Sequence, residues 1–370
     1  MEEVVIVIAD LYLTSAAEAA SIRRVDLPGL GHIARYGTGD SLEHGWRAWL
    51  AHWAGQGKLA SEAPATIASA ASRSVVVNVE QEMVWLATPV HFVAGLSSVH
   101  LDARGLLQVD ADTRQMLATD FGKVFAESGF RLEALSSAGF LLRGPHLPDL
   151  NTVDPARVLG ASISEALPDA GEAPTLRRLG AEIEMWLHDH AVNRERTKRG
   201  QLPITALWLW GGGVARESVS ARFEADSQAT QFADTVPASA IRGAALLAAT
   251  ALPPPGVAFG RDPFLYGLWR LTGTSAQSPP QEFEEILGRS GRRAVFVVEL
   301  SESFATHRDW TIRDALAEAD RRWIGRALAA LRRGDVDRVT VVANDHRLSL
   351  GPRDRLKLWR MPRPALTALQ

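Results

Sequence analysis

The chain has 370 residues, of which 46% are hydrophobic and 22% are charged, and its formal net charge is −3 at pH 7. This length favours two domains, one of them inserted in the other, and the composition suits large buried cores. The charge gives no basic footprint for nucleic acid or for an anionic membrane. The chain has no cysteine, which excludes disulfides, thiolate catalysis and Cys-ligated metals and fits a reducing compartment.

Two apolar segments bear on localisation. The run Val4–Ala9 follows only Met1, Glu2 and Glu3 and lacks the basic leader of a signal peptide. The segment Ala244–Ala251 is too short to span a bilayer. We therefore expect a cytoplasmic protein that has neither nucleic acid nor membrane as a partner.

The first eighty residues contain the signals of an α/β domain. The β-branched run Val4–Ala9 predicts a strand buried on both faces and ending at Asp10. Tryptophans at helical spacing predict a helix over Leu42–Ala54. Ala60–Ser74 is either a loop or a weak helix, and Ser74–Val79 is expected to form the next strand.

From about Pro89 the pattern changes to strands with few crossover helices. The expected elements, in chain order, are strands Phe92–Leu101 and Gly105–Val109 joined by a turn at Asp102–Gly105, a helix Thr113–Ser128 capped by Asp110 or Asp112, a strand pair in Arg131–Leu142, and helical stretches Ala156–Ala166 and Thr175–His190. The order β-β-α-β is typical of a small α+β insert.

The last part of the chain returns to alternating strands and helices. The expected elements are a strand Ile204–Trp210 closed by Gly211–Gly213, a helix Ala238–Thr250, a strand Ala294–Leu300, a helix Thr311–Arg332 and a strand Val339–Val342. We predict an α/β fold with a mainly parallel sheet flanked by helices. Residues 1–88 and 201–370 would form its discontinuous core domain, with the strands at Val4, Ile204, Ala294 and Val339 in one sheet, and residues 89–200 an inserted smaller α+β domain.

Polar residues follow three of these strands. Asp10 comes after the first, Glu302 and His307 follow Ala294–Leu300, and Asp345-His346 follow Val339–Val342. The carboxyl ends of parallel strands form a ligand-binding edge, and Asp, Glu and His are ligands for zinc or manganese. The alternatives are that Asp10 caps a helix, that Asn344-Asp345-His346 is a turn, and that Glu302 and His307 are exposed loop residues.

A resemblance to a known family rests on several segments. The stretch His188–Arg196, Gly200 and the run Pro203–Gly213 resemble a segment of archaeal-type cofactor-independent phosphoglycerate mutases, members of the alkaline phosphatase superfamily. They resemble still more closely the RpfE-type bacterial regulatory proteins, a divergent offshoot of that group. Further matching segments are Trp85–Phe92, the helix after Asp110 and the stretch Leu358–Pro364.

The resemblance implies an alkaline-phosphatase-like sheet that carries two divalent metals, Mn or Zn, and a phosphorylatable Ser. Asp10 matches the first metal Asp, Asp345-His346 match the late Asp-His pair, and His307 matches the His of a DxxxH motif. Ser303 stands where that motif has Asp, with Glu302 beside it. Leu11-Tyr12 replace the family's Gly and second Asp, and only Ser41 and Ser61 are candidate nucleophiles.

A two-metal site needs several carboxylates and a fixed nucleophile. We therefore expect a catalytically degenerate protein that acts by regulation, binding a small phosphorylated ligand or a protein partner. The alternative is an active metal-dependent phosphoglycerate mutase or phosphatase with altered ligands.

Overall fold

A computed structural model describes residues 1–13, 25–72, 82–96, 98–145, 152–167, 174–216, 256–289 and 291–354. The strand expected at 74–79, the helix expected at 238–250 and the matching segment at 358–364 lie outside these ranges. Within them, no helix has both the length and the apolar character needed to cross a membrane.

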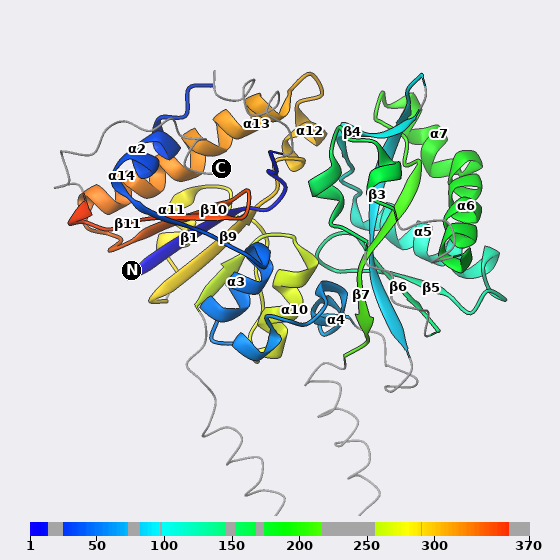
Figure 1. Ribbon diagram of the computed structural model, residues 1–370, viewed down its shortest axis with the longest axis horizontal. Helices are drawn as coiled ribbons and strands as arrows, with labels where there is room; N and C mark the ends of the chain where they lie inside the picture. Colours follow the sequence, from blue (N-terminus) through cyan, green and yellow to red (C-terminus); the bar gives the residue numbers. More distant parts are fainter. Residues whose placement is uncertain are drawn as a thin grey trace, which may run out of the picture.

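The first sheet has the strand order β2-β11-β10-β1-β9-β8 (Figure 1). Its parallel strands are β1 (Glu3–Ile8), β8 (Val257–Phe259), β9 (Arg293–Val298) and β10 (Val339–Ala343). The edge strands β11 (His346–Leu350) and β2 (Thr38–Ser41) are added antiparallel. β-branched residues on both faces explain why β1 and β10 lie in the middle of this sheet.

Helices cover both faces of this sheet. Val4, Ile6 and Ile8 pack under α2 (Pro28–Tyr36), α13 (Ile312–Ala319) and α14 (Gly325–Arg333), the last two joined by a π-helical turn at Asp320–Ile324. Val5 and Val7 face α3 (Gly45–Trp53) and α10 (Pro263–Leu271) on the other side. The expected α/β class with a mainly parallel, helix-flanked sheet is confirmed.

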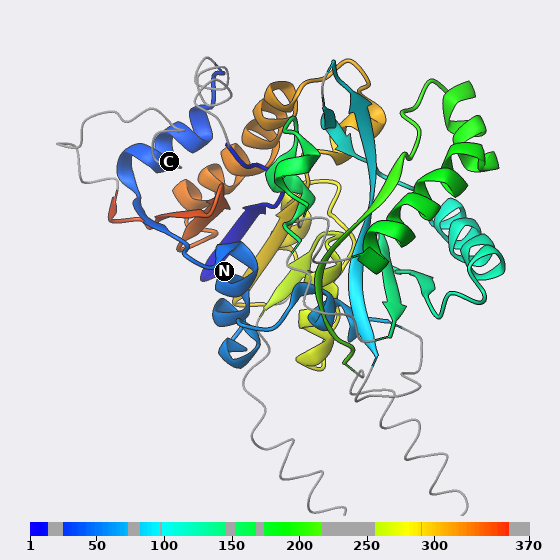
Figure 2. The ribbon, with the colours of Figure 1, turned by 45° about the vertical axis from the view of Figure 1, so that its right-hand side comes forward.

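The second sheet is antiparallel and has the order β4-β3-β6-β5, with β7 also paired to β3. Its strands are β3 (Met83–Ala94), β4 (Val99–Leu106), β5 (Arg131–Ala134), β6 (Phe140–Gly144) and β7 (Ala206–Val214). One face packs on α5 (Ala111–Val124), α6 (Pro174–Asp189) and α7 (Ala191–Lys198), which lie on the side away from the first sheet (Figure 2). The other face contacts α4 (Pro64–Ser69) and the 3₁₀ turns Pro155–Val158 and Ile163–Glu165. The remaining short helices are Gly57–Leu59, α11 (Phe283–Leu287) and α12 (Glu302–Thr306).

The prediction that Ile204–Trp210 belongs to the parallel sheet and ends at the glycines is wrong. β7 pairs antiparallel with β3 in the second sheet and runs through Gly211–Gly213. These glycines make room for neighbouring side chains: a Cβ on Gly212 would lie 2.3 Å from the Trp85 indole nitrogen. An apolar run does not reveal which sheet it joins, and a Gly in a strand often marks close approach rather than an end.

Two local predictions are also wrong. β4 runs through Asp102–Gly105, so the hairpin turn lies between Ala94 and Val99. Gly105 lies beside a register shift in the β3–β4 pairing, where a Cβ would be 2.8 Å from the His91 carbonyl oxygen. The stretch Ala156–Ala166 forms two 3₁₀ turns and no α-helix. The cap of α5 is Asp110, whose side chain accepts a hydrogen bond from the Thr113 amide.

The division into a core domain and an insert at 89–200 stays a prediction. Membership of the two sheets would move its limits outward, because β3 begins at Met83 and β7 ends at Val214.

The short helix α4 joins the two halves of the molecule. Ile67 packs with the core under α3 and α10, whereas Ala65 and Ala68 pack on the second sheet. α10 approaches α4 so closely at Gly267 that a Cβ there would lie 1.9 Å from the Ile67 carbonyl oxygen. This contact fixes one side of the junction between the two sheets.

Candidate functional site

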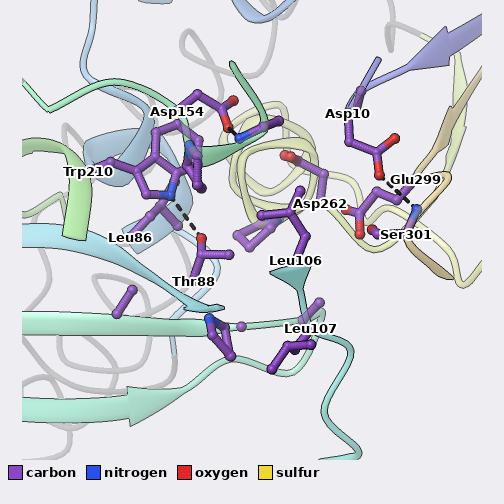
Figure 3. Close-up of a pocket in the computed structure, with 18 of the residues that line it drawn as sticks. Asp10, Leu86, Thr88, Leu106, Leu107, Asp154, Trp210, Asp262, Glu299 and Ser301 are labelled. Atoms are coloured by element: carbon purple, nitrogen blue, oxygen red, sulfur yellow. Dashed lines mark hydrogen bonds between the residues drawn. The ribbon is translucent and has the colours of Figure 1, made fainter. Parts of the chain in front are cut away.

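A carboxylate follows each of the four parallel strands. Asp10 comes after β1, Glu299 after β9, Asp262 after β8 and Asp345 after β10. The strands run parallel, so these residues come from one edge of the sheet, where open α/β sheets bind their ligands. The edge faces the second sheet, and a cleft lies between them (Figure 3).

The Asp10 carboxylate is buried and bonded to backbone. Its two oxygens accept hydrogen bonds from the amides of Leu300, at 2.7 Å, and Ser301, at 2.8 Å. Burial raises the pKa of Asp10, and the hydrogen bonds from Ser301 and Leu300 oppose that rise. Asp10 therefore ties the end of β1 to the loop after β9.

Glu299 is a site residue that the sequence analysis missed. Burial raises its pKa well above the usual range, and the nearby carboxylates of Glu302, Asp262 and Asp10 raise it further. Gln108 donates a hydrogen bond to it across the cleft at 3.1 Å. The sequence analysis placed Glu299 inside the expected strand Ala294–Leu300. In the structure β9 ends at Val298, so Glu299 follows its strand directly, at the same edge of the sheet as Asp10.

An arginine pairs with two of the acids that line the cleft. Arg47, on α3, donates to Asp154 at 2.6 Å and to Asp262 at 2.9 Å, with only 15% of its side chain exposed. Its guanidinium lies over the rings of Trp46 and Trp210. Burial alone would lower the pKa of Arg47, and Asp262 and Asp154 raise it above its usual value.

The cleft has a free volume of about 100 Å³. Asp10, Glu299 and Asp262 line its acidic wall (Figure 3). The opposite wall is mostly apolar and comes from the second sheet and the segments that follow its strands: Leu86, Thr88, Pro89, Leu106, Leu107 and Trp210. The Trp210 indole donates to the Thr88 hydroxyl at 2.9 Å, which fixes the ring in this wall.

Asp345 and His346 lie in and after a hairpin turn. Asn344 and Asp345, with φ of 49° and 55°, form the two-residue connection between β10 and β11. Positive φ at both positions is what the hairpin requires, and Asn and Asp tolerate it. Asp345 pairs with Arg157 at 2.6 Å, and His346 begins β11 opposite Ser41. The acidic cluster around Glu299 contains Asp10, not this pair.

Of the other predicted residues, only Glu302 belongs to the acidic cluster. Burial raises its pKa, while Arg261, 3.4 Å away, lowers it. His307 ends α12 on the surface and stacks on Trp310. Ser41 and Ser61 are exposed and do not line the cleft, so the structure places neither candidate nucleophile beside the acids.

These residues do not fit a metal ion as they stand. Each Asp10 oxygen already accepts an amide N–H, Glu302 faces Arg261, and Asp345 pairs through Oδ2 with Arg157, which leaves its buried Oδ1 without a hydrogen bond. Throughout the part of the chain that the structure describes, no three His, Asp or Glu side chains are grouped so that they could hold one. Metal ligands must present free lone pairs at about 2.0–2.2 Å from the ion.

Comparison with known proteins gives partial matches. The chain is 33% identical over 76 residues to the 2,3-bisphosphoglycerate-independent phosphoglycerate mutase 2 of Methanothermobacter thermautotrophicus, covering 20% of this chain and 19% of that protein. It is 34% identical over 71 residues to a probable enzyme of the same name from Geobacter sulfurreducens, covering 19% of this chain and 18% of that protein. The likeness is to cofactor-independent phosphoglycerate mutases. The matches span about a fifth of these relatives' length, and no family model matches the chain.

Two solved structures align over most of the chain at low similarity. The cofactor-independent phosphoglycerate mutase of Thermoplasma acidophilum aligns with 95% of this chain and 90% of its own, at 15% identity and a TM-score of 0.35. The PH0037 protein of Pyrococcus horikoshii aligns with 99% of this chain and 92% of its own, at 11% identity and a TM-score of 0.46.

Proposed function

We propose that this is a phosphoglycerate-mutase-like protein that has lost phosphoryl transfer and acts by binding a small phosphorylated ligand or a protein partner. The proposal includes the closer likeness to RpfE-type regulatory proteins and a cytoplasmic location. The sequence similarity to cofactor-independent mutases supports the frame of the proposal. The loss of phosphoryl transfer is supported by the contacts of two acids at the strand ends: Asp10 binds backbone amides and Asp262 binds Arg47.

One observation carries the proposal: the Asp10 carboxylate accepts two backbone hydrogen bonds. A carboxylate used in this way holds two loops together and has fewer lone pairs left for a ligand in the cleft. Asp262 supports the same view, because it is paired with Arg47. An acid that is paired with a neighbouring arginine offers little to a cation.

A coupled mutase assay on the purified chain, with and without manganese, tests the loss of activity. We expect no turnover above background, where enzymes commonly reach about 1–10³ s⁻¹. Turnover in that range would overturn the proposal. If Ser41→Ala or Ser61→Ala abolished that turnover, the removed hydroxyl would be identified as the nucleophile.

Calorimetric titration with 3-phosphoglycerate tests binding in the cleft. Ala138 lines the cleft on the loop between β5 and β6, so Ala138→Trp fills part of it. We expect this variant to bind at least about tenfold more weakly, because an overpacked site excludes the ligand. Val124→Trp, at an exposed position on α5, is the control and should bind like the unmodified chain. Equal binding by all three proteins would place the ligand elsewhere.

The alternative is an active metal-dependent mutase or phosphatase with altered ligands. The observation that favours it is that the carboxylates of Glu302, Asp262 and Asp10 all lie near Glu299. Titration with manganese and zinc tests it. Binding that Glu299→Gln and Glu302→Gln weaken would support this alternative, whereas no binding at millimolar metal would exclude it.

A further inference from the structure

A second cavity, of about 160 Å³, borders the acidic cleft and shares Leu106–Gln108 and Ser301 with it. Three segments meet there: the end of β4, the loop after α7 and the segment from α12 to Arg308. Figure 1 shows β4 and α12 side by side at the top of the junction between the two sheets. The cavity is comparable to an engineered cavity of about 150 Å³ that holds benzene, so a phosphate group has room in it.

The lining carries positive charge and no carboxylate. Arg104, Arg196 and Arg308 contribute to it, and no Asp or Glu is among its described lining residues. The nearest acid on the same strand is Asp102, whose oxygen is 3.9 Å from Arg104 Nε. By contrast, Arg47 and Arg157, around the neighbouring cleft, each pair with an aspartate at 2.6 Å.

Backbone carbonyl groups hold Arg104 and Arg196 without using all their donors. Arg104 donates to the Arg308 carbonyl at 2.8 Å, and Arg196 donates through Nε to the Leu202 carbonyl at 2.8 Å. The Arg308 guanidinium lies against the turn after α7, where a Cβ on Gly200 would come 2.9 Å from its Nη1. Each guanidinium has five N–H donors in a planar fork, so further donors remain for a ligand.

We propose that this cavity is a binding site for a small oxyanion, the phosphate group of a ligand. Guanidinium groups that line one cavity can match the oxygens of phosphate and form short, charge-assisted hydrogen bonds with them. Burial lowers the pKa of Arg196, opposed by Asp110, and an anion would also favour its charged form. The site is separate from the proposed cleft function, because its lining arginines do not line the cleft.

Titration of the full chain with inorganic phosphate, followed by ³¹P NMR at constant ionic strength, tests the site. Arg308→Gln is the main variant, because its side chain makes no hydrogen bond or ion pair with any other described residue. Arg104→Gln is the second. Arg313→Gln, at an exposed position on α13 outside the cavity, is the control of equal charge. Loss of a charged donor should weaken phosphate binding about tenfold or more.

We expect weaker binding in Arg308→Gln and Arg104→Gln and unchanged binding in Arg313→Gln. The proposal would be overturned if the unmodified chain did not bind phosphate. It would also be overturned if all three variants bound phosphate equally weakly, because that result would indicate non-specific attraction to the surface charge. A parallel titration with acetate distinguishes a carboxylate site from a phosphate site: tighter acetate binding, lost in Arg308→Gln, would refute phosphate as the ligand group. Ala138→Trp should leave phosphate binding unchanged, which separates this result from the test of the cleft.

Discussion

Replacing Asp10 separates its two conceivable roles, a clamp between loops and a metal ligand. Asp10→Ala removes the acceptor for the amides of Leu300 and Ser301 and leaves both N–H groups buried. A buried unsatisfied donor costs about 1–3 kcal/mol, so the variant should lose about 2–6 kcal/mol of unfolding free energy. Asp10→Asn keeps one acceptor oxygen and turns an NH₂ group toward the other amide, so its loss should be smaller, about 1–3 kcal/mol.

Urea denaturation monitored by tryptophan fluorescence measures these losses. Asp309→Ala, an exposed aspartate in the same region, is the control and should stay within about 0.5 kcal/mol of the unmodified chain. Each curve is repeated with 1 mM manganese. A ligand present at a hundred times its Kd would add about 2.7 kcal/mol of stability, and we expect no such gain for any of the proteins.

Two results would refute the reasoning on Asp10. If Asp10→Ala unfolds at the same urea concentration as the unmodified chain, the two backbone bonds do not hold the loops. If manganese stabilises the unmodified chain and not the Asp10→Asn variant, Asp10 is a metal ligand and the hydrogen-bonded arrangement gives way to it.

Three further outcomes follow from single contacts. The pKa of Glu299 is higher in the folded than in the unfolded chain, so its contribution to stability is complete below about pH 4.3 and falls as the pH rises toward the folded value. The unfolding free energy of Glu299→Gln, measured by urea titration, should therefore rise relative to that of the unmodified chain between pH 4 and pH 8. A difference that does not change with pH would contradict this. The Asp320 carboxylate accepts hydrogen bonds from the Gly29 and Leu30 amides in the first turn of α2. Asp320→Ala should therefore lower the unfolding free energy by about 1–2 kcal/mol in the same assay. A loss under about 0.5 kcal/mol would exclude this capping role. Gly267→Ala should destabilise by about 1–3 kcal/mol or more because of the Ile67 carbonyl, whereas Gly122→Ala, inside α5 with open space around it, should stabilise by about 0.5–1 kcal/mol; equal effects of the two would refute the packing of α4 on α10.

The parallel strands were predictable because their residue types leave few alternatives. The runs at β1, β9 and β10 are β-branched and apolar at nearly every position, which fits only a strand buried on both faces. From parallel strands it follows that Asp10 comes from the ligand-binding edge. The position of a residue was therefore predictable where it depended on the end of a buried strand.

The partners of these residues were not predictable, since they come from distant segments. Arg47 lies on α3, a helix predicted from its tryptophans, and nothing in that pattern indicates that it binds Asp154 and Asp262. Glu299 was missed through a strand boundary placed two residues too late. Both errors have one cause: hydrophobic periodicity locates elements and leaves side-chain pairing to tertiary structure.

The contacts between the two sheets differ in kind on the two sides of their junction. On the side of α4 they are close and apolar, with Gly267 against Ile67. Around the cleft they are polar: Gln108 donates to Glu299, and Arg104 donates to the Arg308 carbonyl. Polar contacts exchange with water or ligand oxygens at little net cost, whereas buried apolar contacts do not. A ligand that reaches from the acidic cleft into the basic cavity must replace these polar contacts, so its binding is coupled to how the two sheets meet on that side and leaves the packing at α4 intact.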